Sequence, residues 1–240
     1  MGNQLSALTW LALRQLWITF RLLPLLALPL VGGLATALLA ESFDAPLMPL
    51  ALGVAVAFAL CAGLAADALS QERRSGTAAW LTLRAVPRST IVLGWFAAIA
   101  VPVVVGVGAS AFLGWIAIAG APGAPGVGEL ANQPVTFAAL AIAAATVGLQ
   151  AVGIGLAAGS LARPWLATLL AIVVMVGLLV GTSLVTDWDP NLPIGGLWLL
   201  AHGDDLTRPL SDGVVSAGIG LAGAGLLVGL SAALFSRVDL

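Results

Sequence analysis

Residues 164–186 read PWLATLLAIVVMVGLLVGTSLVT, a stretch without a single charged side chain. About 20 apolar residues in a helix cross the hydrocarbon core of a bilayer, so this stretch alone predicts a transmembrane helix. The composition of the whole chain agrees. Of its 240 residues, 60% are hydrophobic and only 8% are charged, whereas a soluble domain carries about 25% charged residues. The chain is therefore predicted to be an integral membrane protein in contact with the lipid bilayer.

Five more stretches have the same character, and together they predict an all-α fold with a single transmembrane domain over residues 1–240. The run from 89 to 128 is long enough to raise the question of two spans, but its tail, GAPGAPGVG at 120–128, is a sequence that helices avoid. We count it as one span. The predicted transmembrane helices are residues 22–40, 46–68, 90–119, 135–158, 164–186 and 213–235.

The arginines predict the orientation of these spans, because cytoplasmic loops carry an excess of basic residues. With the N-terminus in the cytoplasm, eight of the nine arginines fall on the cytoplasmic side and only Arg208 lies outside. Two spans within 89–128 would also place Arg163 and Arg237 outside. The charge pattern therefore favours six spans with the N- and C-termini both in the cytoplasm.

Several absences limit the chemistry of the chain. It has no lysine, and so no phosphate-binding loop of the form G-x-x-x-x-G-K-[ST]. A single cysteine and a single histidine exclude a multi-cysteine metal site and an H-E-x-x-H zinc site. A net charge of −2 argues against a nucleic-acid partner, because phosphate neutralisation needs clustered basic residues. We therefore expect no catalytic residue, metal or cofactor in this chain.

Residues 3–21 are predicted to form an amphipathic interfacial helix that precedes the first span. At 100° per residue, Trp10 and Trp17 share one face, with Arg14 and Arg21 beside it. Rings at the level of the headgroups and guanidinium groups that reach water are typical of a helix on a membrane surface. This helix is either a simple anchor or an elbow that also contacts a cytoplasmic partner.

Residues 70–89, between the second and third spans, read SQERRSGTAAWLTLRAVPRS. A short helix is predicted here, with a serine able to cap its start and a proline to end it. Trp and Arg dominate the energetics of protein interfaces, so one side of this helix suits docking into a protein cleft. Alternatively, the arginines only set the orientation and the tryptophan lies in the membrane interface. The residues that would share this side are Thr77, Trp80, Leu81 and Arg84.

The same segment carries the pattern E-R-R-x-G-T, then a short apolar helix, then V-P-R-S-x-I-V-L-G. This pattern resembles the permease subunits of type-2 ABC exporters. It departs from the family at residues 78–81, AAWL, where the family commonly has Glu-x-Leu-Leu, and at Trp95, where the family usually has lysine. The interfacial helix, the six spans and a partly apolar outer segment resemble the same family over the whole chain. The matching residues are Glu72, Arg73, Gly76, Thr77, Pro87, Arg88, Ser89 and Gly94.

The resemblance implies a type-2 ABC exporter-like fold in the cytoplasmic membrane of a prokaryote. Such a permease pairs with a second copy or a paralogue, and the pair binds cytoplasmic ATP-binding subunits that hold the ATP and Mg²⁺. Residues 70–89 would be the cytoplasmic coupling loop, and 187–212 an outer loop with a short non-spanning segment near the exit. The implied contacts with the ATP-binding subunit are Glu72, Arg73, Gly76, Thr77, Trp80, Leu81, Arg84, Pro87 and Arg88.

Three alternatives to this function stay open. A cytochrome c biogenesis permease of the haem-export type has a similar size and a related loop. A secondary transporter would need several polar residues at mid-span and an inverted repeat, whereas the mid-span segments consist of Ala, Leu, Val and Gly. A membrane scaffold that transports nothing is compatible with the number of spans.

Asp67 is the one acid near the interior of a predicted span. Acids at membrane depth are candidates for function. Arg74 lies seven residues on, on the same helical face, and a proton relay normally needs more than one buried acid. We therefore interpret Asp67 as a structural pair or a coupling contact.

Overall fold

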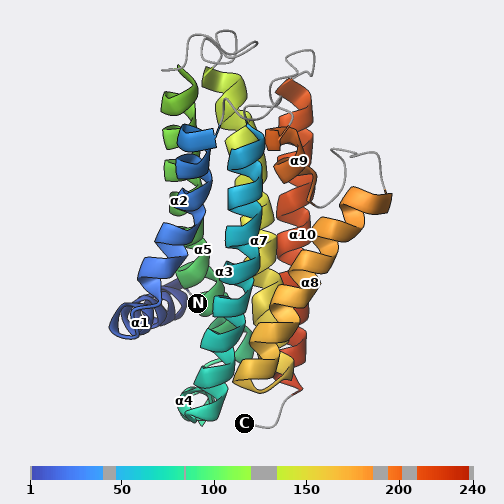
Figure 1. The fold of residues 1–240 in the computed structure, drawn as a ribbon. Coiled ribbons are helices and arrows are strands. Elements are labelled where there is room, and N and C mark those ends of the chain that lie inside the picture. The colour runs from blue at the N-terminus through green and yellow to red at the C-terminus, as the bar shows by residue number, and fades with distance from the viewer. Residues whose placement is uncertain are drawn as a thin grey trace.

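The structure is a computed structural model that describes residues 2–39, 47–83, 85–119, 134–185, 194–201 and 210–237. These residues form nine helices and no strand (Figure 1). The predicted all-α fold, with six apolar helices long enough to cross a membrane, is confirmed. The helices are α1 (Gly2–Ile18), α2 (Leu22–Leu39), α3 (Met48–Arg74), α4 (Thr77–Leu83), α5 (Arg88–Ala119), α7 (Pro134–Leu161), α8 (Pro164–Val185), α9 (Gly195–Ala201) and α10 (Leu210–Ser236).

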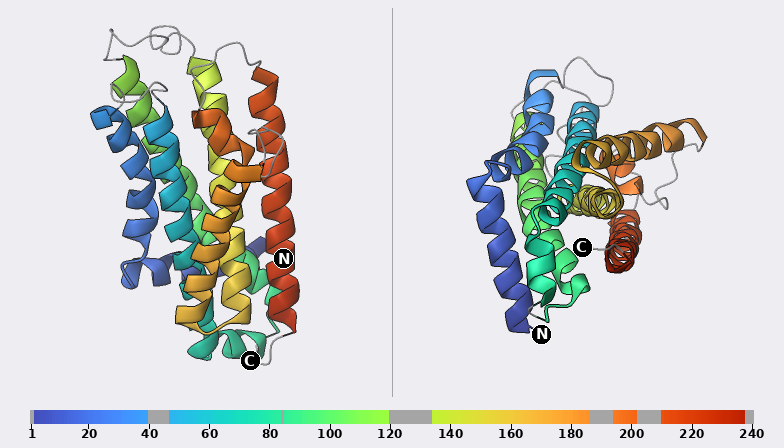
Figure 2. Two further views of the ribbon diagram at one scale, coloured as in Figure 1. Left: turned by 45° about the vertical axis from the view of Figure 1, so that its right-hand side comes forward. Right: turned by 90° about the horizontal axis from the view of Figure 1, so that it is seen from below.

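The six long helices run alternately up and down, and the short ones mark the two ends of the bundle (Figure 1). Helices α1 and α4 lie at one end together with the C-terminal end of α10; we call this the α4 end. Helix α9 lies toward the other end, the α9 end. Figure 2 shows α1 lying across the bundle and α8 leaning away from it. Both described termini therefore lie toward the same end.

Helices α3, α5 and α7 form the centre of the bundle, and α2, α8 and α10 its outside. In the most apolar window of each helix, 61–67% of the residues are buried in the first group and 17–28% in the second. The exposed side chains of the outer helices are apolar, for example Leu169 and Val173 of α8 and Leu226 of α10. An apolar exterior of this kind suits contact with lipid.

Some element bounds differ from those expected from the sequence. Helix α3 continues to Arg74, six residues past the predicted end of its span, because nothing before Gly76 interrupts the helix. Helix α5 runs uninterrupted through Pro102. In the predicted outer loop of 187–212, α9 is a seven-residue helix that packs on α3, α7 and α10, and residues 186–193 and 202–209 lie outside the described residues.

Glycine allows the central helices to approach each other closely. A Cβ atom on Gly155 of α7 would overlap the carbonyl oxygen of Ala62 in α3, and one on Gly159 would lie 2.6 Å from the carbonyl oxygen of Ala66. Helix–helix association in lipid depends on such close packing, since there is no hydrophobic gain from leaving an apolar solvent. By contrast, Gly177 of α8 faces open space.

We predict that Gly155→Ala destabilises the bundle, whereas Gly177→Ala does not. The added methyl group at Gly155 must push α7 away from α3, a kind of overpacking that costs about 1–3 kcal/mol. The free energy of unfolding of both variants in detergent micelles measures the difference. Equal stability of the two variants would contradict the close contact between α3 and α7.

Candidate functional site

The turn between α3 and α4 depends on the conformation of Gly76. Its φ angle is +76°, in the left-handed region that glycine adopts at no steric cost. The amide of Gly76 donates to the carbonyl of Arg73, and that of Ser75 to the carbonyl of Gln71. These bonds satisfy the last carbonyls of α3, as in a common helix C-terminal motif. The left-handed conformation that this turn requires therefore accounts for glycine at position 76.

Helix α4 has one buried side and one exposed side. Ala78 is fully buried and Leu81 is 8% exposed, while Trp80 is 49% and Leu83 is 86% exposed. The predicted face of Thr77, Trp80, Leu81 and Arg84 is thus partly wrong, because Leu81 points into the core. Leu83, rather than Leu81, is exposed together with Trp80. Thr77 is half-buried, and Arg84 lies outside the described residues. We call the pair Trp80 and Leu83 the exposed face of α4.

The end of α4 is fixed by a second left-handed residue. Ala85 has a φ angle of +60°; its amide donates to the carbonyl of Thr82, and the amide of Val86 donates to the carbonyl of Leu81. This pair of bonds is the Schellman motif. Pro87 follows, and α5 begins at the next residue. Helix α4 is therefore held between α3 and α5 by two short turns with defined hydrogen bonds.

Glu72 faces the core of the protein. Its side chain is buried, and its carboxylate accepts a hydrogen bond of 3.0 Å from the Nε2 of Gln15 in α1. A buried carboxylate needs such a partner, because leaving water costs free energy. In this structure the Glu72 side chain is therefore not exposed for the implied contact with a partner subunit. Its hydrogen bond to Gln15 instead links α1 to the end of α3.

Asp67 forms an ion pair with Arg21, which lies in the turn between α1 and α2. Its carboxylate also accepts hydrogen bonds from the side-chain amide of Gln71, one turn further along α3. The pair is with Arg21, not with Arg74 as the spacing along the helix suggested. Asp67 and Glu72 thus make two separate attachments between α3 and the N-terminal segment.

Two motif arginines bind the C-terminal ends of other helices. The Nη1 of Arg73 donates to the carbonyls of Gly159 and Ser160 in α7, at 3.1 and 2.7 Å. The Nη1 of Arg88 donates to the carbonyl of Ser236 in α10 at 2.8 Å. A cation is favourable at the negative end of a helix, where the last carbonyls lack partners. Arg73 and Arg88 therefore join the connection around α4 to two further spans.

The N-terminal helix packs one side against the bundle and leaves its aromatic rings outside. Ala12 and Leu16 are buried, whereas Trp10, Arg14 and Trp17 are exposed. Helix α1 packs mainly on α5, where a Cβ atom on Gly94 would lie 2.9 Å from the Cβ of Leu8. Tryptophan rings on the outer side of a helix at the end of the bundle agree with a position in the membrane interface.

Sequence reasoning overlooked two glutamines that the structure buries or half-buries. Nothing in the sequence marks Gln15 as the partner of an acid 57 positions away. Gln150 is buried in the middle of α7 and donates to the carbonyl of Gly220 in α10 at 3.2 Å, so the mid-span segments are not wholly apolar. An amide inside an otherwise apolar span is a signal that could have been found, since it must find a partner there.

No protein-family model matches this sequence, and no curated protein shows significant similarity to it. Within the described ranges, no group of three or more His, Cys, Asp or Glu side chains is placed to hold a metal ion. The class of protein that these findings define is a multi-pass helical membrane protein with six candidate spans.

We predict that Gln15→Leu lowers the free energy of unfolding by about 1–3 kcal/mol, because it leaves the buried carboxylate of Glu72 without its hydrogen bond. Gln4→Leu is the control: Gln4 lies in the same helix and is exposed, so the change should be close to neutral. Unfolding in detergent measures both effects. Adding Glu72→Gln to Gln15→Leu should recover part of the loss, since a neutral amide is less costly to bury than a carboxylate. No loss in Gln15→Leu would refute the attachment.

Proposed function

We propose that this chain is the permease subunit of a type-2 ABC exporter, which moves a substrate across the cytoplasmic membrane with ATP hydrolysed by a separate subunit. The observation that carries the proposal is α4, a short helix between the second and third long helices with Trp80 and Leu83 exposed. An exposed tryptophan on a firmly held helix suits insertion into a cleft of a partner protein, with Leu83 extending the apolar surface beside it.

The contacts around α4 support a role in transmitting force. Ala78 and Leu81 seat α4 on the bundle, and its two turns join it directly to α3 and α5. Arg73 and Arg88 extend these connections to the ends of α7 and α10. A displacement of α4 by a partner would therefore act on four of the six long helices at once.

The source of energy lies on another chain in this proposal. The sequence contains no lysine, and a phosphate-binding loop needs one to hold the β- and γ-phosphates. ATP and Mg²⁺ are therefore assigned to the partner subunit. This chain contributes the path through the membrane and the helix on which the partner acts.

A second permease, either an identical copy or a paralogue, completes the proposed transporter. The outer helices leave several glycines open to their surroundings, with no atom within 4 Å of the place where a side chain would begin. Small residues on such surfaces allow helices of two chains to approach closely. The glycines are Gly177 and Gly181 of α8 and Gly218, Gly225 and Gly229 of α10.

We predict that Trp80→Ala and Leu83→Ala weaken the binding of the ATP-binding subunit. Truncation of a tryptophan at the centre of an interface costs about 2 kcal/mol or more, roughly 30-fold in Kd. The measurement is the affinity of the full-length chain in detergent for an ATP-binding subunit encoded in a neighbouring reading frame. Leu166→Ala, which removes an exposed apolar side chain of α8, is the control and should leave the affinity unchanged. Unchanged binding in both α4 variants would reject the docking role.

The proposal also requires the α4 end to face the cytoplasm. We predict that Ser75→Cys, at the exposed turn before α4, reacts with a membrane-impermeant maleimide only after cells are lysed. Asp212→Cys, in the first turn of α10 toward the opposite end, should react in intact cells. Native Cys61 gives no background because it is buried. Labelling of Ser75→Cys in intact cells would rule out coupling to a cytoplasmic ATP-binding subunit.

A further inference from the structure

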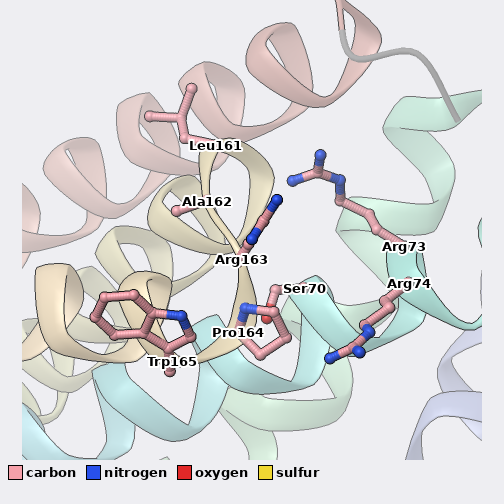
Figure 3. Close-up of a pocket in the computed structure, with 8 residues that line it drawn as sticks. All are labelled: Ser70, Arg73, Arg74, Leu161, Ala162, Arg163, Pro164 and Trp165. Atoms are coloured by element: carbon pink, nitrogen blue, oxygen red, sulfur yellow. The ribbon is translucent and has the colours of Figure 1, made fainter.

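A pocket of about 800 Å³ opens at the α4 end, between the last turn of α3 and the turn that joins α7 to α8. The side chains of Arg73 and Arg74 extend from α3 and that of Arg163 from the α7–α8 turn, toward the same space (Figure 3). Trp165, at the start of α8, lines the pocket beside them. The pocket is separate from the exposed face of α4, since neither Trp80 nor Leu83 lines it.

The charge of this pocket is not balanced by the described part of the protein. None of the eight described residues that line it is acidic. The two described acids near this end are engaged elsewhere, Asp67 with Arg21 and Glu72 with Gln15. The Nη1 of Arg73 donates to backbone carbonyls, which are neutral, and no described acid forms an ion pair with Arg73, Arg74 or Arg163. Three guanidinium groups in one pocket therefore lack a described anionic partner.

The start of α8 adds to this positive character. Helix α8 begins with Pro164 on the pocket wall and has no acidic residue in its first turn. The first amides of a helix lack partners within it and carry the positive end of the helix dipole. An anion in this pocket would thus meet guanidinium groups and the first amides of α8, while the opposing last carbonyls of α7, at Gly159 and Ser160, are already bonded to Arg73.

The apolar surroundings indicate what kind of molecule carries the anion. Trp165 is 70% exposed, and tryptophan is typical of the headgroup level of a bilayer. From there α8 runs away from the pocket along the outside of the bundle (Figure 1), and its exposed side chains, including Leu169 and Val173, are apolar. An acyl chain could follow this surface while its headgroup stays among the arginines. A free inorganic anion has no acyl chain to contact this apolar surface.

We propose that this pocket binds the phosphate headgroup of an anionic phospholipid in the leaflet at the α4 end. Basic pockets between transmembrane helices are suited to such headgroups, because guanidinium groups bind phosphate with several hydrogen bonds. The lipid would hold the end of α3 and the α7–α8 turn together at the membrane surface. This inference does not rest on the transport function, since it requires only that the chain lies in a bilayer.

The test is native mass spectrometry of the full-length chain in detergent, titrated with dioleoylphosphatidylglycerol or with dioleoylphosphatidylcholine. We expect the anionic lipid to bind more tightly, and Arg74→Gln and Arg163→Gln each to weaken it about fivefold, the effect of about 1 kcal/mol per basic residue near an anionic surface. Both arginines are exposed, so neither change should disturb folding. Arg237→Gln, which removes an exposed arginine at the same end but outside the pocket, is the control.

The outcomes distinguish a specific binding site from general electrostatic attraction between the protein and anionic lipid. They also distinguish a lipid ligand from a soluble anion. Equal weakening in Arg237→Gln, or no preference for the anionic lipid, would overturn the proposal. Each titration is repeated with inorganic phosphate as a competitor, and full displacement of the lipid by that ion at low concentration would assign the pocket to a soluble anion instead. Lipid binding that is retained in the presence of phosphate and weakened about fivefold in each of the two pocket variants supports the lipid site.

Discussion

The hydrocarbon core of a bilayer offers no hydrogen-bond partner to the polypeptide backbone. For a chain with this composition, that constraint leaves helices as the way to satisfy each amide and carbonyl within its own segment. It also removes the usual gain from burying apolar side chains, so the helices are held by close contact and by polar groups that bridge them. Both kinds of contact are present: Gly155 lies against α3, and Gln150 and Ser231 bond across the interface between α7 and α10.

The charged side chains that the structure describes lie toward the ends of the bundle. At the α4 end, the acids of α3 attach the N-terminal segment, while Arg73 and Arg88 cap the ends of α7 and α10. Several residues of the motif that predicted a coupling loop therefore bind other helices of this chain and stabilise the α4 end. The surface left for a partner on the described part of α4 is apolar and consists chiefly of Trp80 and Leu83.

The number of long helices could be predicted from the sequence because an uncharged run of sufficient length has few alternatives. The short helix α4 was also predictable, since serine, glycine and proline surround it. Which side of α4 is buried was not, because Leu81 and Leu83 are chemically identical and only the neighbouring helices distinguish them. The partners of Arg73 and Arg88 could not be predicted either, because an arginine side chain does not indicate which helix end it will cap. These partners lie 86 positions from Arg73 and 148 positions from Arg88.

The bond between Arg88 and the carbonyl of Ser236 has a practical consequence for handling the protein. It holds the last turn of α10 beside the first turn of α5, directly after the segment that contains α4. An affinity tag or fluorescent reporter placed directly after Arg237 would therefore begin close to that surface and compete for space with a molecule that approaches α4, so an insertion at the α9 end of the bundle is the safer design.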